Sequence, residues 1–174
     1  MSSIDRFRDR KAQIEAGTGF DTEDLISTLY RKQGLEEIRI LVATKGGHSL
    51  VLIRTMKREG DIWMTSRWIS IVPDQIEAVL DGLDKAGIHY LSVAGAPEDT
   101  LPTFPISCGD AGDLTVKLDR YNGYFNIKIT RRTGNDWAII RPNEIEEVIA
   151  ALLNAYDRIT GSHTEGPIEE EVPF

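Results

Sequence analysis

The chain has 174 residues, of which 41% are hydrophobic, and its formal net charge is −8 at pH 7. This length allows one domain or two small ones with a sizeable core. No apolar run approaches the roughly 18 residues that span a bilayer, and residues 1–11 lack the apolar stretch of a secretory signal. The one cysteine, Cys108, has no disulfide partner and no companion at metal-ligand spacing. We therefore expect a cytoplasmic protein without a metal or another cofactor.

The first 35 residues are predicted to be an N-terminal helical segment. Residues 2–16 and 21–33 both have a helical pattern, and the second stretch carries an apolar stripe. Asp21 or Thr22 would cap that second helix.

The middle of the chain repeats itself. Residues 68–80 (WISIVPDQIEAVL) align with residues 137–149 (WAIIRPNEIEEVI), and residues 47–53 (GHSLVLI) match residues 123–129 (GYFNIKI). We interpret this as two copies of one unit, at residues 36–87 and 112–160.

Within each copy the pattern predicts strands that precede a helix. First strands are expected at 38–42 and 114–118, followed by turns at Gly46-Gly47 and Asn122-Gly123. In the second strand of the second copy, alternation places Phe125, Ile127 and Ile129 inward and a polar, basic face outward. A third strand is expected near 61–66, and a fourth at 68–72 or 137–140.

A helix begins at Pro73 in the first copy and at Pro142 in the second, so each unit is read as ββββα. Residues 88–111, with three prolines, form the predicted connection and include a short strand at 89–93. Residues 161–174 are polar and are expected to be a disordered acidic tail. The predicted fold class is therefore α+β, with two tandem ββββα repeats, N-terminal helices and this tail.

Basic residues are concentrated in two blocks, although the whole chain is acidic. Residues 39–72 and residues 114–142 each contain six Lys or Arg and two Asp or Glu. Net charge alone argues against binding to nucleic acid, but this segregation predicts two basic surfaces at equivalent places in the two copies.

The order of these features resembles the positive-cofactor-four family of transcriptional coactivators, which are kin of the Whirly single-stranded DNA binders. The resemblance rests on GHSLVLIR at 47–54, the charged hairpin that follows it, and WISIVPDQ at 68–75. It covers residues 36–87 and 112–157. It implies a curved four-stranded sheet plus a helix, dimerisation through the helices, and single strands running over the paired sheets. A tandem copy then implies an intramolecular pseudo-dimer.

Two departures from the family pattern put half of the DNA path in question. The second copy has a shortened hairpin at 133–136, and Trp68 and Trp137 replace the usual glycine before the fourth strand.

Sequence-tolerant binding of a single strand needs cations for the phosphates and exposed aromatic faces for the bases. The candidate phosphate contacts are Lys45, Arg54, Lys57, Arg58, Arg67, Arg120, Lys128, Arg131, Arg132 and Arg141. The candidate stacking groups are Trp63, Trp68, Tyr121, Tyr124 and Trp137, among which Tyr124 is the first choice. Because Trp68 and Trp137 recur at equivalent positions, they could instead pack in the core or between the two repeats.

The last six residues form a distinct acidic and aromatic motif, which consists of Glu169, Glu170, Glu171, Val172, Pro173 and Phe174. It resembles the acidic tip of bacterial single-stranded DNA-binding proteins, which implies a peptide that recruits DNA-processing proteins. The alternative is a solvating acidic tail in which the Phe has no role.

No catalytic arrangement is evident in the sequence. His48, His89 and His163 lack ligand spacing, and Cys108 has no His-Asp arrangement around it, so we do not expect an enzyme.

The sequence thus predicts a single-stranded DNA-binding protein of a bacterium or a phage-infected cell, present as a monomeric pseudo-dimer or a homodimer. It would protect single strands and recruit replication, recombination or repair proteins. The alternatives are an acidic protein-binding or chaperone-like module and a transcription regulator that binds melted DNA.

Overall fold

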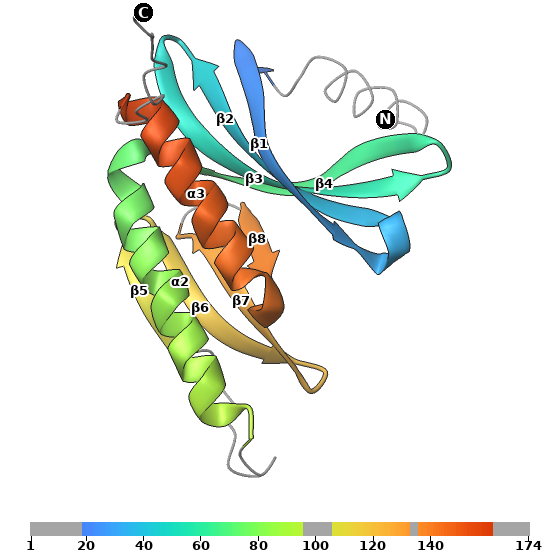
Figure 1. Cartoon of the computed structure of the whole chain (residues 1–174), viewed down its shortest axis with the longest axis vertical. Helices are drawn as coiled ribbons and strands as arrows, with labels where there is room; N and C mark the ends of the chain where they lie inside the picture. Colours follow the sequence, from blue (N-terminus) through green and yellow to red (C-terminus); the bar gives the residue numbers. More distant parts are fainter. Residues whose placement is uncertain (1–18, 96–105, 133–135, 162–174) are drawn as a thin grey trace, which may run out of the picture.

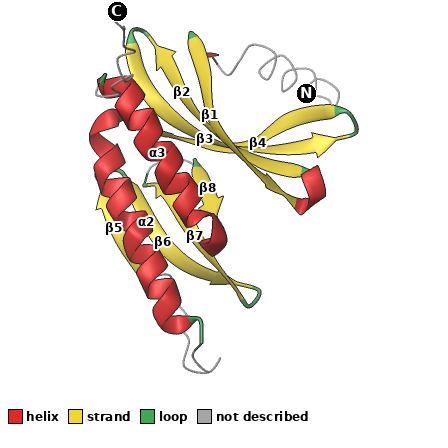
Figure 2. Ribbon diagram, viewed as in Figure 1, coloured by secondary structure: helices red, strands yellow, loops and turns green. Residues whose placement is uncertain are grey.

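The computed structural model describes residues 19–95, 106–132 and 136–161. These residues form an α+β fold with two antiparallel sheets and two long helices (Figures 1 and 2). The strands follow the chain in order, β1-β2-β3-β4 in the first sheet and β5-β6-β7-β8 in the second. Within the described part, neither long helix combines the length and the apolar character needed to cross a membrane.

Each sheet precedes one long helix along the chain. The first group of elements is β1 (Thr22–Arg31), the short 3-10 helix η2 (Lys32–Gly34), β2 (Glu36–Lys45), β3 (His48–Glu59), β4 (Ile62–Ile71) and α2 (Pro73–Val93). The second group is β5 (Ile106–Ala111), β6 (Leu114–Tyr121), β7 (Tyr124–Arg131), β8 (Trp137–Ile140), η4 (Pro142–Glu144) and α3 (Ile145–Thr160).

The first sheet has one face in the core and one outer face. Ile40, Ile53 and Ile69 lie opposite one another on β2, β3 and β4, and all three are buried. Because side chains alternate along a strand, the neighbouring row of Arg39, Arg54 and Trp68 points to the outer face.

The second sheet follows the same rule. Asn122 and Gly123 have φ values of 51° and 79°, which is the left-handed conformation that a two-residue hairpin turn requires. On β7 the side chains of Ile127 and Ile129 are buried, whereas Tyr124 is exposed. The predicted hairpin and the predicted alternation along β7 are both confirmed.

Each helix packs mainly on the sheet of the other group. Helix α2 lies against β5 and β6, α3 lies against β1, β2 and β3, and the two helices contact each other (Figure 1). Buried residues of both sheets and both helices therefore belong to one continuous apolar cluster.

Buried polar contacts also join the two groups. The guanidinium of Arg31, at the end of β1, donates to both carboxylate oxygens of Glu144 and, at 2.8 Å, to the carbonyl oxygen of Ile139. In the opposite direction, Arg131 of β7 donates to the carbonyl oxygen of Ser70 at 2.5 Å. Unpaired buried charges are costly, so these contacts fix how the two sheets meet.

The helix predicted at 21–33 is wrong, because this segment forms β1 and pairs with β2 from Thr22↔Thr44 to Arg31↔Glu36. A bulge at Ile26 shifts the alternation by one residue, which gives the apolar residues a spacing that imitates a helix. Pairing with β2, the next strand of the chain, overrides this local pattern.

Three further predictions differ from the structure, two in the bounds of strands and one in the type of element. The strands expected at 61–66 and 68–72 are one strand, β4, which is bulged at Ser66. The strand expected at 89–93 is the last part of α2. The stretch interpreted as a connection ends in β5, which is the first strand of the second sheet.

The predicted strands near 38–42, 114–118 and 137–140 and the helices that begin at Pro73 and Pro142 are present, the second through η4. The helix predicted at 2–16 and nearly all of the predicted tail lie outside the described residues.

Candidate nucleic-acid interface

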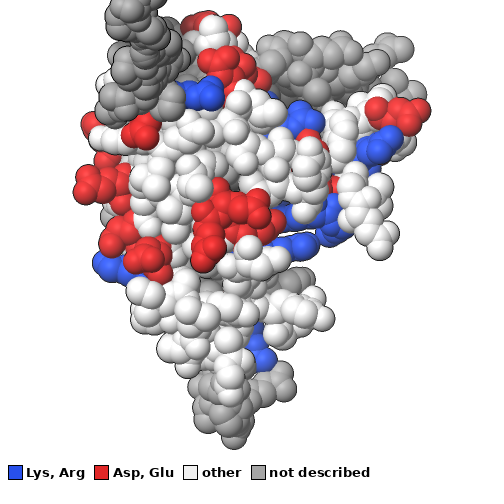
Figure 3. All heavy atoms as spheres, viewed as in Figure 1, with Lys and Arg blue, Asp and Glu red and all other residues white. Residues whose placement is uncertain are grey.

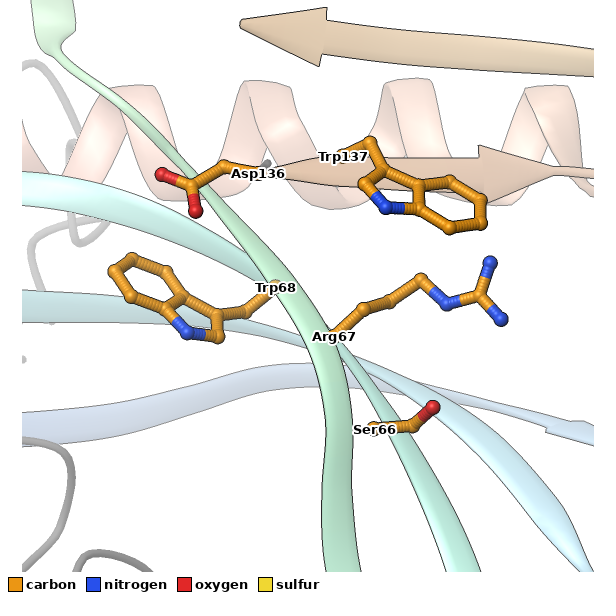
Figure 4. Close-up of a pocket in the computed structure, with 5 residues that line it drawn as sticks. All are labelled: Ser66, Arg67, Trp68, Asp136 and Trp137. Atoms are coloured by element: carbon orange, nitrogen blue, oxygen red, sulfur yellow. The ribbon is translucent and has the colours of Figure 1, made fainter. Parts of the chain in front are cut away.

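Two strands that are far apart in the sequence bring basic and aromatic side chains together. Strands β4 and β8, the last strands of their sheets, lie next to each other. The bulge at Ser66 occurs where β4 passes β8, and a bulge turns the neighbouring side chains away from their regular directions. Ser66, Arg67 and Trp68 from β4 line one cavity of about 320 Å³ with Asp136 and Trp137 (Figure 4).

Trp137 lies close to two cations in this region. The guanidinium carbon of Arg67 is 3.9 Å from the centroid of the indole, and the Nζ atom of Lys128 is 4.5 Å from it. We call Arg67, Lys128 and Trp137 the tryptophan cluster. Within the described residues, neither Arg67 nor Lys128 forms an ion pair with a carboxylate. A half-buried indole with two such cations matches what a base and its flanking phosphates require.

The surroundings of Arg67 change the pKa of its side chain. Burial lowers the pKa of its guanidinium, the nearby carboxylate of Glu36 raises it, and the charge of Arg31 lowers it again. The guanidinium still remains protonated at neutral pH. It is therefore a permanent cation that has already lost part of its hydration, which makes contact with an anion less costly.

A further cation, Lys117, lies beside the tryptophan cluster. Lys117 on β6 is directly opposite Lys128 on β7, and both point to the outer face of the second sheet. Like charges placed opposite each other destabilise a sheet unless an anion compensates them. We therefore expect repulsion between Lys117 and Lys128 to lower the stability of the protein, and a bound phosphate would reduce this repulsion.

The outer face of the first sheet contains an equivalent pair that is already compensated. Arg39 lies opposite Arg54, but Arg39 pairs with Glu37, and Arg54 makes two hydrogen bonds to Glu23, at 2.7 and 3.1 Å. The carbon of the Arg39 guanidinium is 5.8 Å from the centroid of Trp63. The predicted phosphate contact Arg54 is thus buried and occupied by an ion pair.

Trp68 packs against the outer face of the first sheet. Its ring meets that of Phe20 edge to face, with 6.0 Å between the centroids, above the buried side chains of Leu41 and Leu52. Neither Trp68 nor Trp137 belongs to the central apolar cluster. Trp68 is a packing residue of this smaller outer cluster, whereas Trp137 contacts cations at the place where the two sheets meet.

The other candidates are more dispersed. Lys45 lies with its Nζ atom 6.0 Å from the ring centroid of Phe20, and the exposed Lys57 and Arg58 lie toward the β3–β4 hairpin. Arg58 donates to the carbonyl oxygen of Gly60 and lies 3.6 Å from a carboxylate oxygen of Asp61.

On the second sheet, Arg131 is held by Asp113, by Ser70 and, at 3.7 Å, by Asp136, and Arg132 is exposed beside it. Two hydrogen bonds, from Arg131 first and from Gln75, lower the pKa of Asp113 despite the opposing effect of burial.

Tyr124, Arg120 and Arg141 lie toward the β6–β7 turn and the end of β8. Tyr124 is 76% exposed and lies opposite Tyr121 in the register of the hairpin. Arg120 is 6.0 Å from the ring centroid of Phe125, and Arg141 lines a separate groove that also contains Tyr124.

Sequence reasoning missed Lys117, Arg39 and Phe20 as neighbours of the site. The alternation along 114–118 was a usable signal for Lys117, because it points to the same face as Lys128 once β6 pairs with β7. Phe20 gave no such signal, because it precedes a segment that resembled a helix. The candidate partner-binding residues Glu169–Glu171 and Val172–Phe174 lie outside the described residues.

The face that carries the helices differs in charge from the strand edges. Acidic side chains dominate over α2 and α3 in Figure 3, and their exposed carboxylates include Asp74, Glu77, Asp81, Glu146 and Glu147. Among the described residues, no group of three or more His, Cys, Asp or Glu is placed to hold a metal ion. No protein-family model and no curated protein matches the chain.

Proposed function

We propose that this protein binds single-stranded DNA without strong sequence preference and is not an enzyme. The observation that carries the proposal is the half-buried Trp137, whose ring centroid lies 3.9 Å from the guanidinium carbon of Arg67 and 4.5 Å from Nζ of Lys128. A base stacked on the exposed part of this ring would gain roughly 1–3 kcal/mol, and both flanking cations would meet phosphates. The compensating anion that the opposed Lys117 and Lys128 lack would come from the same strand.

The proposal includes an intramolecular pseudo-dimer of two ββββα repeats. Its support is the reciprocal packing, in which α2 covers β5 and β6 while α3 covers β1, β2 and β3. The edge strands β4 and β8 then meet near the centre, as two sheets of a dimer would. A single strand that crosses this junction would touch both repeats, which gives one chain the binding surface of a dimer.

The test is a fluorescence-anisotropy titration of single-stranded and double-stranded oligonucleotides at two salt concentrations. For the wild type we expect binding to single strands that weakens steeply with salt. Trp137→Ala should weaken it about 5- to 150-fold, which corresponds to one lost stacking contact. Arg67→Gln and Lys128→Gln should each reduce the slope of log K against log salt by about 0.7.

Arg158→Gln is a matched control, because this arginine is exposed on α3, away from the tryptophan cluster. It should leave both the affinity and the slope nearly unchanged. Absence of oligonucleotide binding at low salt would contradict the proposal. Salt-insensitive binding of unfolded polypeptides instead would favour the protein-binding or chaperone-like alternative, and a requirement for a melted promoter would favour a transcription regulator.

The C-terminal motif would recruit DNA-processing proteins in the cytoplasm of a bacterium or a phage-infected cell. Its glutamates would also compete weakly for the basic surface when no strand is bound. Removal of residues 165–174, which contain four glutamates and no basic residue, should therefore raise the affinity for single strands at low salt. An unchanged affinity would count against this competition.

A further inference from the structure

A second hollow lies at the far end of β8 from Trp137. It has a volume of about 990 Å³ and is formed by the end of α2, the β6–β7 turn, and the segment that joins β8 to α3. Strand β8 pairs only with residues Ile127 to Thr130 of β7, so among the described strands none covers Tyr124 to Asn126 on that side. The hollow exists because β8 is shorter than β7 and the chain turns away at Arg141.

The walls of this groove are aromatic. The rings of Tyr90 and Phe125 meet at 73° with 5.7 Å between their centroids. Tyr124 is 76% exposed, so most of its side chain is accessible to a ligand. The Asn122-Gly123 turn directly precedes it and has the compact left-handed geometry described above, so the turn fixes the position of Tyr124.

The polar groups around the groove are amides and cations. Three asparagines, Asn122, Asn126 and Asn143, line it together with Arg141 and Lys32, and none of the lining residues described is acidic. Lys32 lies 3.3 Å from Glu36, whereas the guanidinium of Arg141 forms no ion pair within the described residues. Side-chain amides donate and accept in the pattern that base edges present, and guanidinium groups suit phosphate.

We propose that this groove binds one nucleotide, with its base against Tyr124 and the asparagine amides and its phosphate at Arg141. The inference deepens the proposed function, on which it rests for the identity of the strand. Lys128 and Tyr124 lie on the same face of β7, four residues and therefore about 13 Å apart. A strand that passes Trp137 can thus reach the groove, and the amides would give binding a base preference at this one position.

Mononucleotides test the groove without the strand. The 5′-monophosphates of adenosine, cytidine, guanosine and uridine would each be titrated into the ¹⁵N-labelled full chain. We expect shifts of the side-chain amide signals of Asn122, Asn126 and Asn143, with affinities that differ among the four bases. Arg141→Gln should weaken this binding about 10-fold, and free phosphate should compete with it.

Oligonucleotides test the same site in a strand. In homopolymers of equal length, Tyr124→Ala should lower affinity about 5- to 150-fold and reduce the difference between bases. Tyr30→Ala is the matched control, because Tyr30 is 75% exposed but does not line the groove, and Arg158→Gln controls for charge. Neither should alter the base preference.

The outcomes separate this inference from the proposed function. If oligonucleotide binding responds to Trp137→Ala but the asparagine signals do not respond to any mononucleotide, the groove proposal is wrong and the single-strand proposal stands. If mononucleotides shift those signals but no oligonucleotide binds, the groove is a free-nucleotide site and the single-strand proposal is wrong. Shifts caused only by the synthetic acidic peptide EEEVPF would overturn the groove proposal in favour of peptide binding.

Discussion

Two glycines allow α2 to approach the second sheet closely. A Cβ atom at Gly82 would lie 2.8 Å from Cγ2 and 2.9 Å from Cβ of Val116, and one at Gly109 would lie 2.9 Å from the Cα atom of Gly82. Val116 is buried, so it has no free space into which to move. The close contact between α2 and the second sheet therefore depends on the absence of a side chain at Gly82 and at Gly109.

Gly82→Ala should destabilise the protein. The added methyl group forces apart two packed elements at a cost of about 1–3 kcal/mol, against a gain of roughly 1 kcal/mol in helix propensity, and because Val116 is buried we expect the upper part of that cost. Gly87→Ala in the same helix is the control, because its Cβ would meet Ile145 Cδ1 at an ordinary 3.5 Å. Urea unfolding should show a lower midpoint for Gly82→Ala and an equal or higher one for Gly87→Ala. A stabilised Gly82→Ala variant would contradict the close contact.

Glu36 should make stability depend on pH. Its burial by itself raises its pKa, but hydrogen bonds and charges from Lys32 and Arg31 outweigh this and lower the pKa below the usual 4.5. A lowered pKa in the folded state stabilises the protein above the usual pKa, and this contribution is lost as the pH falls through the lowered value. Arg67 also faces this carboxylate from β4.

We expect the free energy of unfolding to decrease below about pH 4.5, and Glu36→Gln to flatten this decrease while lowering stability at pH 7. Chemical denaturation between pH 3 and pH 7 measures both effects. Asp61→Asn is the control, since Asp61 is fully exposed and its distance to Arg58 is 3.6 Å. Equal slopes for the wild type and Glu36→Gln would contradict the role of Glu36.

At the scale of elements, the end of β1 is joined to η4 and β8 by one buried side chain. Arg31 contacts Glu144, Glu36 and the carbonyl oxygen of Ile139, and all three charged side chains are at least nine-tenths buried. Glu144 also accepts a hydrogen bond from the backbone N–H of Arg141 at 2.8 Å. The contacts of Arg31 and Glu144 therefore hold the backbone at Arg141, a residue that lines the groove.

Arg31→Met should cost about 3–5 kcal/mol of unfolding free energy, because Glu144 would remain buried without its cation. Arg58→Met breaks an exposed pair and should cost no more than about 1 kcal/mol. Urea denaturation of the two variants provides the comparison. Equal losses would show that Arg31 does not join the two groups of elements.

The sequence predicted most of these elements, but it misassigned both first strands. The alternation along β7, the Asn-Gly turn and the prolines before α2 and η4 are local signals, and each was interpreted correctly. Strands β1 and β5 each contain a bulge, at Ile26 and at Cys108, which interrupts the alternation. Only pairing with β2 and β6 identifies them as strands, because a bulge is visible in the register between two paired strands and not in the pattern of one segment alone.

At the scale of the whole molecule, neither group of elements covers its own sheet. Helix α2 lies on the second sheet and α3 lies on the first, so each group alone would expose the apolar face of its sheet. The stability of the two groups is therefore coupled through a shared core.

Fragments 19–95 and 106–161 should not fold separately as monomers, whereas a mixture should recover the native near-ultraviolet circular dichroism. The physical reason is that the helix needed by each sheet belongs to the other fragment. The intact chain is the reference for the spectrum. Cooperative unfolding of monomeric fragment 19–95 would contradict the inference that each sheet needs the helix of the other group.

Local sequence signals were sufficient to predict the α+β class, the strands β2, β3, β6 and β7, the starts of the two long helices, and the two basic blocks. Alternation, turn residues and charge are local properties, and they act wherever the chain lies. Two features follow only from the three-dimensional packing: both Arg67 and Lys128 lie close to the ring of Trp137, and Arg54 is paired with Glu23. The contacts of Trp137 depend on the approach of β4 to β8, and the pair of Arg54 with Glu23 depends on the order of β1, β2 and β3 in the first sheet.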